Sequence, residues 1–129
     1  MLNDPIANAL SKILNAEKVS KSDCIIKPVS NTIKKILKIM QEKKYIGEFE
    51  EIKDGKGNYI KINLIGHINK CGAIKPKYPT KKDQFEKFEN RYLPAKDFGI
   101  IFVSTNQGIM THIEAKEKKI GGVLLAYCY

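Results

Sequence analysis

The sequence predicts a mixed fold built from short helices and short strands. Apolar residues recur at three-to-four-residue spacing in two segments of the first half, and they alternate with polar residues over 59–65. A third pattern is the apolar run at 100–103, which ends in two hydroxyl side chains. With 129 residues, the chain is long enough to form one compact domain or two very small ones.

The first helix is predicted over residues 5–16. Asp4 is a suitable N-cap residue, and Pro5 fits the first helical position, where its missing N–H costs no hydrogen bond. The apolar residues that follow fall on one helical face: Ile6, Leu10, Ile13 and Leu14.

A short strand and a second helix come next. Residues 24–29 form an apolar strand that Pro28 stops, and Ser30 or Asn31 can cap a helix that runs to about Lys43. The apolar face of this helix comprises Ile33, Ile36, Leu37 and Met40.

A hairpin completes the first half. Residues 48–53 and 59–65 are predicted strands joined by the turn-rich segment 54–58, and apolar residues alternate along the second strand. The order helix, strand, helix, strand, strand can close a two-layer core in which the helices lie on a three-stranded sheet.

The second half begins after a seam at 66–72 and starts with a lysine-rich ribbon. Phe85, Phe88 and Tyr92 follow at three-to-four-residue spacing, which indicates one face of a short helix or a packed loop more than base stacking.

A strand at Ile100 and a helix after Thr111 are predicted next, because Glu114 stands at the capping-box distance from Thr111. The pair Gly121–Gly122 is expected to end this helix and to turn the chain into a last strand over 123–129.

The charge of the chain favours a polyanionic partner. Its net charge is +9, from 23 lysines and arginines against 14 acidic residues, and each lysine that meets a phosphate releases counterions. The alternative is that the lysines reflect a lysine-rich genome and that the function itself needs no positive charge. Residues 66–82 contain no acid, and the lysines of this ribbon are Lys70, Lys75, Lys77, Lys81 and Lys82. The lysines of 33–44 read more simply as a solvated helix face.

The segment after the strand at 100–103 is the candidate recognition surface. Ser104 and Thr105 bring hydroxyls, and Asn106 and Gln107 bring amides, to a loop that continues through Gly108. These side chains are costly to bury without partners, so we expect the loop to be exposed. Regular structure on both sides would hold it in place.

The sequence contains no recognisable catalytic or metal site. Nothing ties His67 or His112 to a nucleophile and an orienting acid, and His112 is expected at the surface near a helix start. No phosphate-binding glycine motif is present. Cys24, Cys71 and Cys128 are odd in number and lack a C-x-x-C pair, so we expect reduced, small apolar residues. No enzyme, metal or cofactor is predicted.

No apolar run approaches the roughly 20 residues that a membrane span needs. The N-terminus lacks the pattern of a signal peptide. We therefore expect a soluble cytoplasmic protein without a membrane partner.

Several blocks of the chain resemble one family in the same order. The run Ser-Thr-Asn-Gln-Gly-Ile-Met-Thr at 104–111 is the most specific of them. Further matches are Asp4–Ala7, Asn15–Ala16, Pro28, Ser30, Ile36–Leu37, Tyr45–Ile46, Lys75–Pro76, Glu114–Ala115, Gly121–Gly122 and Ala126–Tyr127. With these blocks the whole chain resembles the ribosomal protein S8 family of the small subunit. Tyr92–Ala95 and Asp97–Gly99 are similar to its archaeal branch.

The resemblance implies an α+β fold of two small domains. Residues 1–66 would form an N-terminal α/β domain, and residues 67–129 a mainly β, rRNA-binding domain with one short helix. The family binds a central-domain helix of small-subunit rRNA early in assembly, so the chain is expected to be a structural constituent of the subunit. Its partners would be this rRNA and neighbouring ribosomal proteins, and the free protein would be a monomer.

The resemblance also implies where the RNA is bound. Ser104, Thr105, Asn106, Gln107 and Gly108 correspond to the loop that enters the irregular core of the RNA helix. Hydroxyls, amides and an unhindered glycine backbone suit the edges and sugars of distorted nucleotides. In the lysine ribbon, Lys70, Lys75 and Lys77 are expected to meet phosphates and to set the register without reading sequence.

Some positions depart from the family pattern. Leu14 stands where the first helix is often basic, and Lys44 stands where glycine is usual, which would strain a left-handed turn. Asn31–Thr32, Phe102 and Val123 also differ, and none of these positions lies in the recognition loop. Two other classes remain open. A nucleic-acid-modifying enzyme would need catalytic groups that the sequence does not offer. The other class is a basic RNA-binding or protein-interaction module outside the ribosome; a protein-interaction module with no RNA role would explain the fold but not the polar loop.

Overall fold

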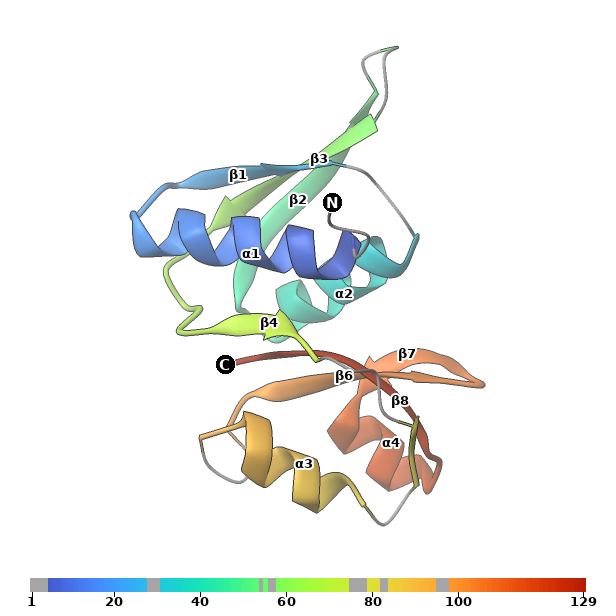
Figure 1. Cartoon of the computed structure of the whole chain (residues 1–129). Coiled ribbons are helices and arrows are strands. Elements are labelled where there is room, and N and C mark those ends of the chain that lie inside the picture. Colours follow the sequence, from blue (N-terminus) through green and yellow to red (C-terminus); the bar gives the residue numbers. More distant parts are fainter. Residues whose placement is uncertain are drawn as a thin grey trace. The chain divides into compact units, whose positions relative to one another are not determined.

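The computed structural model describes residues 5–27, 31–53, 55, 58–74, 79–81, 84–94 and 98–129. The chain divides into two compact units, Met1–Asn69 and Lys70–Tyr129. Each unit packs helices against an antiparallel sheet (Figure 1). The predicted α+β class is therefore confirmed.

The N-terminal unit has the predicted element order. It consists of α1 (Pro5–Lys18), β1 (Asp23–Ile26), α2 (Asn31–Glu42), β2 (Ile46–Lys53) and β3 (Asn58–Leu64). The three strands form an antiparallel sheet in the order β1-β3-β2, and both helices cover one of its faces (Figure 1). The proposed cap residues Asp4 and Ser30, and Pro28, lie outside the described residues.

Alternation along the strands and helical spacing build this core. In β3 the side chains of Ile60 and Ile62 are fully buried, while those of Lys61 and Asn63, which alternate with them along the strand, are exposed. The helix faces predicted from spacing supply the other layer, with Leu10 and Ile13 from α1 and the four apolar residues of α2 buried. Apolar burial of this kind is the main stabilising contribution to a small two-layer unit.

Helix α2 closes on a non-glycine residue in the left-handed region. Lys44 has φ of 65°. The N–H of Lys44 donates to Gln41 O, and the N–H of Tyr45 donates to Met40 O, which is a Schellman closure. Lys44 therefore occupies the conformation for which glycine is favoured, as its departure from the family pattern predicted. Its carbonyl accepts a hydrogen bond of 2.9 Å from Nδ1 of the exposed His67.

The C-terminal unit contains β4 (Cys71–Ala73), β5 (Pro79–Thr80), α3 (Phe85–Tyr92), β6 (Ile100–Thr105), β7 (Gly108–Thr111), α4 (His112–Lys118) and β8 (Gly122–Cys128). Its strands are ordered β4-β8-β6-β7, and β5 also pairs with β8. Both helices lie on one side of this sheet (Figure 1).

The described part of this unit has two short helices where one was expected. Phe85 and Phe88 are buried in the core of the unit, and Tyr92 packs partly buried against it. Their spacing did indicate a helix or a packed loop, and the packing interpretation is confirmed. An eight-residue helix forms because its apolar face completes the core beneath β6 and β8.

A buried polar cluster joins α3, α4 and β6. Nδ1 of His112 accepts a hydrogen bond of 3.1 Å from the Ile101 N–H, so this nitrogen carries no proton. Nε2 of His112 lies 3.4 Å from Oε1 of Glu89, and Lys116 donates to the same oxygen. The expectation that His112 lies at the surface is wrong. Strand β7 passes directly into α4 at Thr111, so the first helical side chain falls under the sheet.

The glycine pair at the start of β8 has a different role from the predicted one. Helix α4 closes at Lys119, which has φ of 57°, and not at the glycines. A Cβ on Gly121 would lie 3.1 Å from the Cα of Lys81, and one on Gly122 would lie 3.0 Å from the carbonyl carbon of Ser104. The glycines therefore let β8 enter between two neighbouring segments.

Candidate nucleic-acid interface

Strands β6 and β7 form a tight hairpin that carries the predicted recognition residues. Thr105 pairs with Gly108, Ser104 pairs with Ile109, and Asn106 and Gln107 form the turn. The predicted loop is thus shorter than expected, because Gly108–Thr111 is a strand. All five residues from Ser104 to Gly108 are nevertheless brought together at one tip, and Asn106 and Gln107 are exposed.

Gly108 makes the reversal of the hairpin possible. Its φ is +113°, a conformation that L side chains rarely adopt, and nothing lies within 4 Å of the place where its Cβ would be. Positive φ occurs at only three non-glycine residues of the described chain, and neither turn residue is one of them. The sharp bend therefore falls on Gly108. The open space beside it leaves the backbone accessible to a ligand.

The Thr105 hydroxyl is already engaged within the hairpin. It donates to Gly108 O at 2.8 Å and accepts from the Gln107 N–H at 3.1 Å. This hydroxyl therefore fixes the turn of the hairpin. A hydroxyl oxygen has two lone pairs, so one acceptor position is left for a ligand.

Ser104 differs from its neighbour. Its side chain is half-buried and makes no hydrogen bond to any other residue that the structure describes. The side chains of Asn106 and Gln107 are likewise unengaged within the described chain. Three polar groups at the tip therefore keep their donors and acceptors available.

The described parts of the lysine ribbon include β4 and β5, which pair with opposite ends of strand β8. Lys70 is exposed and pairs with Tyr129 through two backbone hydrogen bonds, at the end of β8 far from the hairpin. At the other end, Thr80 pairs with Gly122, next to the Ser104–Val123 pair of the hairpin strand. Lys70 is thus not brought together with the hairpin. Lys75 and Lys77 lie outside the described residues.

Two lysines near the hairpin were missed as site residues. Lys81 follows β5 and is exposed, and its backbone lies against Gly121. Lys119 is also exposed and precedes Gly121 by two residues, so it stays within about 7 Å of it along the chain. The sequence shows both lysines, but only the pairing of β5 with β8 brings Lys81 to the hairpin end of the sheet.

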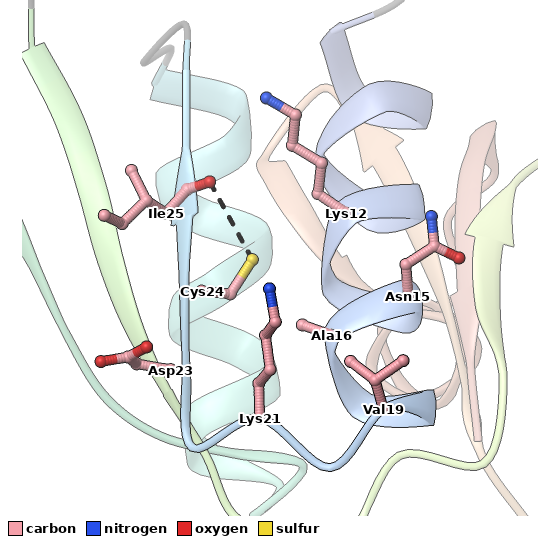
Figure 2. A pocket seen from close by; sticks show the side chains of 8 residues that line it. All are labelled: Lys12, Asn15, Ala16, Val19, Lys21, Asp23, Cys24 and Ile25. Carbon is pink, nitrogen blue, oxygen red and sulfur yellow. Dashed lines mark hydrogen bonds between the residues drawn. The ribbon is translucent and has the colours of Figure 1, made fainter.

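The N-terminal unit has a basic groove of its own, between α1 and β1. Figure 2 shows the side chains of Lys12 and Lys21 beside this groove, whose cavity volume is about 530 Å³. Neither ammonium group has an ion-pair partner within the described chain. Val19 and Ile25, which also line the groove, are 65% and 53% exposed. The groove therefore combines positive charge with accessible apolar surface.

Cys24 in the same groove is an ordinary protonated thiol. Burial raises its pKa, and the nearby positive charges of Lys12 and Lys21 only partly offset that effect. Its Sγ points to the carbonyl of Ile25 at 4.0 Å (Figure 2). Cys71 and Cys128 are also buried, and neither forms a disulfide. The described residues include no group of three His, Cys, Asp or Glu side chains able to hold a metal ion.

No helix in the described part of the chain is long and apolar enough to cross a membrane. The interface that remains is a polar hairpin tip with Lys81 and Lys119 near it and Lys70 at the far end of β8, an arrangement suited to a structured polyanion.

Comparison with known families agrees with an interface for a structured polyanion. The family model described as ribosomal protein S8 matches residues 4–129, which is nearly the whole chain. Since the match includes the hairpin, both glycines at the start of β8 and both units, the chain belongs to the ribosomal protein S8 family, whose members are rRNA-binding proteins of the small ribosomal subunit that act in translation.

Proposed function

We propose that the hairpin tip from Ser104 to Gly108 reads an irregular segment in a central-domain helix of small-subunit rRNA, and that this contact makes the chain a primary, assembly-promoting rRNA binder. The observation that carries the proposal is the tip itself. It holds unengaged polar groups on a rigid two-stranded support, and a left-handed glycine leaves the backbone open.

The chemistry of the tip fits unpaired nucleotides. Sequence-specific RNA recognition targets distorted positions whose bases and 2′-hydroxyls are accessible. Ser104 can donate and accept, and Asn106 and Gln107 each offer an amide that pairs with base edges. The free lone pair of Thr105 can accept from a 2′-hydroxyl.

Lysines supply the part of the affinity that does not depend on sequence. Lys81 and Lys119 would meet phosphates beside the hairpin, and Lys70, with Lys75 and Lys77, would extend the contact along the ribbon. The N-terminal groove with Lys12 and Lys21 is a further positive surface that a large RNA could reach.

The proposed role is binding alone. The described residues offer no metal cluster, and the buried His112 is held by Ile101 and Glu89 instead of facing a ligand. The free chain is proposed to be a monomer in the cytoplasm that joins the rRNA first and neighbouring ribosomal proteins afterwards.

A footprint on naked small-subunit rRNA tests this proposal. The wild-type chain should protect one irregular helix of the central domain, and Ser104→Ala should need several-fold more protein for the same protection. Ser11→Ala, on the exposed face of α1, is the matched control and should behave as wild type. Protection that is unchanged by Ser104→Ala, or that lies outside the central domain, would contradict the proposal.

The alternative is a basic module that binds RNA or protein outside the ribosome. Such a module would bind through charge with little preference among RNA helices. Equal affinity for the rRNA helix and for a random duplex at moderate salt would support this alternative over the proposed role.

A further inference from the structure

Four aromatic side chains form a row in the C-terminal unit, and the proposed RNA site does not use it. This aromatic row consists of Phe98, Tyr129, Tyr127 and Tyr92. The ring centroids of Phe98 and Tyr129 are 6.4 Å apart, those of Tyr129 and Tyr127 are 6.2 Å apart, and those of Tyr127 and Tyr92 are 5.5 Å apart. Both tyrosine pairs are stacked, so the row is continuous.

Two glycines hold the row in place. Gly99 has φ of +93°, and a Cβ there would lie 2.7 Å from the Cβ of Tyr129, so only glycine lets the chain bring Phe98 beside Tyr129. Gly72 pairs with Tyr127 across β4 and β8, and a Cβ there would lie 3.2 Å from the Tyr127 hydroxyl. The Tyr127 ring therefore lies over a strand position without a side chain.

A lysine stands on the same face as the row. Lys70 and Tyr129 exchange two backbone hydrogen bonds, of 2.9 and 2.8 Å, which makes them directly opposite residues. Residues directly opposite in an antiparallel pair point to the same face of the sheet. The exposed Lys70 side chain therefore starts next to the Tyr129 ring.

One end of the row is accessible. Phe98 is 49% exposed, although phenylalanine side chains of this unit such as Phe85 and Phe102 are fully buried. An accessible aromatic ring beside a cation is the combination that binds unpaired nucleotides, since any base can stack on the ring while the cation meets the phosphate.

The row lies far from the hairpin. Ser104 pairs with Val123 at one end of β8, and Tyr129 follows the other end. The six residue-to-residue steps from Val123 to Tyr129 span roughly 20 Å at about 3.3 Å per step. The two surfaces therefore contact different nucleotides.

We propose that the aromatic row is a second RNA contact, in which an unpaired base of the bound rRNA stacks on Phe98 and Lys70 meets the adjoining phosphate. The inference rests on the proposed rRNA-binding function. A protein segment is the less favoured occupant, because a lysine stands opposite Tyr129, the ring next to Phe98, and the chain carries a net charge of +9.

The absence of tryptophan from this chain gives a direct test. Phe98→Trp places a single tryptophan at the end of the row. When naked small-subunit rRNA is added to saturation, base stacking should quench its emission. Unchanged emission, or a brighter and blue-shifted emission, with the RNA fully bound would overturn the proposal.

Affinity measurements supply the second readout. Phe98→Ala should weaken binding to the same RNA roughly 5- to 150-fold, the range for one base stacked on an aromatic ring, while Phe98→Tyr should restore it. Ile65→Ala is the matched control, since Ile65 is 42% exposed in the other unit, and it should bind as wild type. Equal affinities of Phe98→Ala and wild type would contradict the inference.

The two proposals can fail separately. In a protein that carries both Phe98→Trp and Ser104→Ala, more RNA should be needed for half-maximal quenching, while the quenching at saturation should stay the same. If Ser104→Ala has no effect and quenching persists, the hairpin proposal fails and the aromatic contact stands. If Ser104→Ala weakens binding and no quenching occurs, the aromatic contact fails alone.

Discussion

The two neighbouring hydroxyls of the hairpin should respond differently to removal, although the sequence suggests that they are equivalent. Thr105→Ala removes the donor to Gly108 O and the acceptor for the Gln107 N–H. Ser104→Ala removes a hydroxyl that bonds to no described residue. The first change therefore affects the folded protein itself, and the second affects mainly its complex.

The magnitude follows from the two lost hydrogen bonds. Each contributes about 0.5–1.5 kcal/mol net, and the tip is partly exposed, so Thr105→Ala should lower the free energy of unfolding by about 1–2 kcal/mol. For a domain of 60–100 residues this shifts the unfolding midpoint by about 4–8 °C per kcal/mol. Ser104→Ala should stay within about 0.5 kcal/mol of wild type.

Urea titration followed by circular dichroism measures both free energies, and Thr105→Ser is the control that keeps the hydroxyl. Binding to the rRNA helix, measured where every variant is folded, should weaken for Ser104→Ala by roughly 5- to 150-fold. Equal stability of the two alanine variants would refute the reasoning, because it would mean that the Thr105 hydrogen bonds do not support the turn.

Three further outcomes test the fold. Lys44→Gly should raise the free energy of unfolding by about 1 kcal/mol in urea titration, because it relieves a left-handed residue, and a loss of stability would contradict the Schellman closure. Glu89→Leu should lower the free energy of unfolding by about 3 kcal/mol, and Glu89→Gln should lower it clearly less, since only glutamine can still accept a hydrogen bond from His112. Equal thermal midpoints for the two variants would count against the buried cluster. Because the pKa of Cys24 is raised, the unfolded chain ionises first, and the free energy of unfolding should fall as pH rises above the ordinary thiol pKa of about 8.5. Urea titrations in that range should show a smaller fall for Cys24→Ala, and an identical fall would argue against a buried thiol.

Regular patterns made the N-terminal unit predictable. The alternation in β3 and the helical spacing in α1 and α2 each place the apolar residues on one face, and the structure buries that face. The hairpin residues were predictable for a related reason. A polar run directly after a fully apolar strand can only be a turn or an exposed loop.

Long-range pairing explains what the sequence did not reveal. Whether His112 is exposed depends on β7 running into α4 without a break, and the Glu89 that pairs with it lies 23 positions earlier on another helix. The position of Lys81 depends on the pairing of a two-residue strand with β8. Local propensity carries no information on such contacts, because they are decided by tertiary packing.

The central claim is that the hairpin reads RNA structure while lysines supply affinity. The most direct measurement is the ratio of dissociation constants for the central-domain rRNA helix and for a random duplex, for Ser104→Ala and Lys81→Gln at several salt concentrations. Ser104→Ala should weaken binding only to the rRNA helix. Lys81→Gln should weaken binding to both RNAs alike and reduce the salt slope by about one unit. A Ser104→Ala variant that keeps the wild-type ratio would contradict the account.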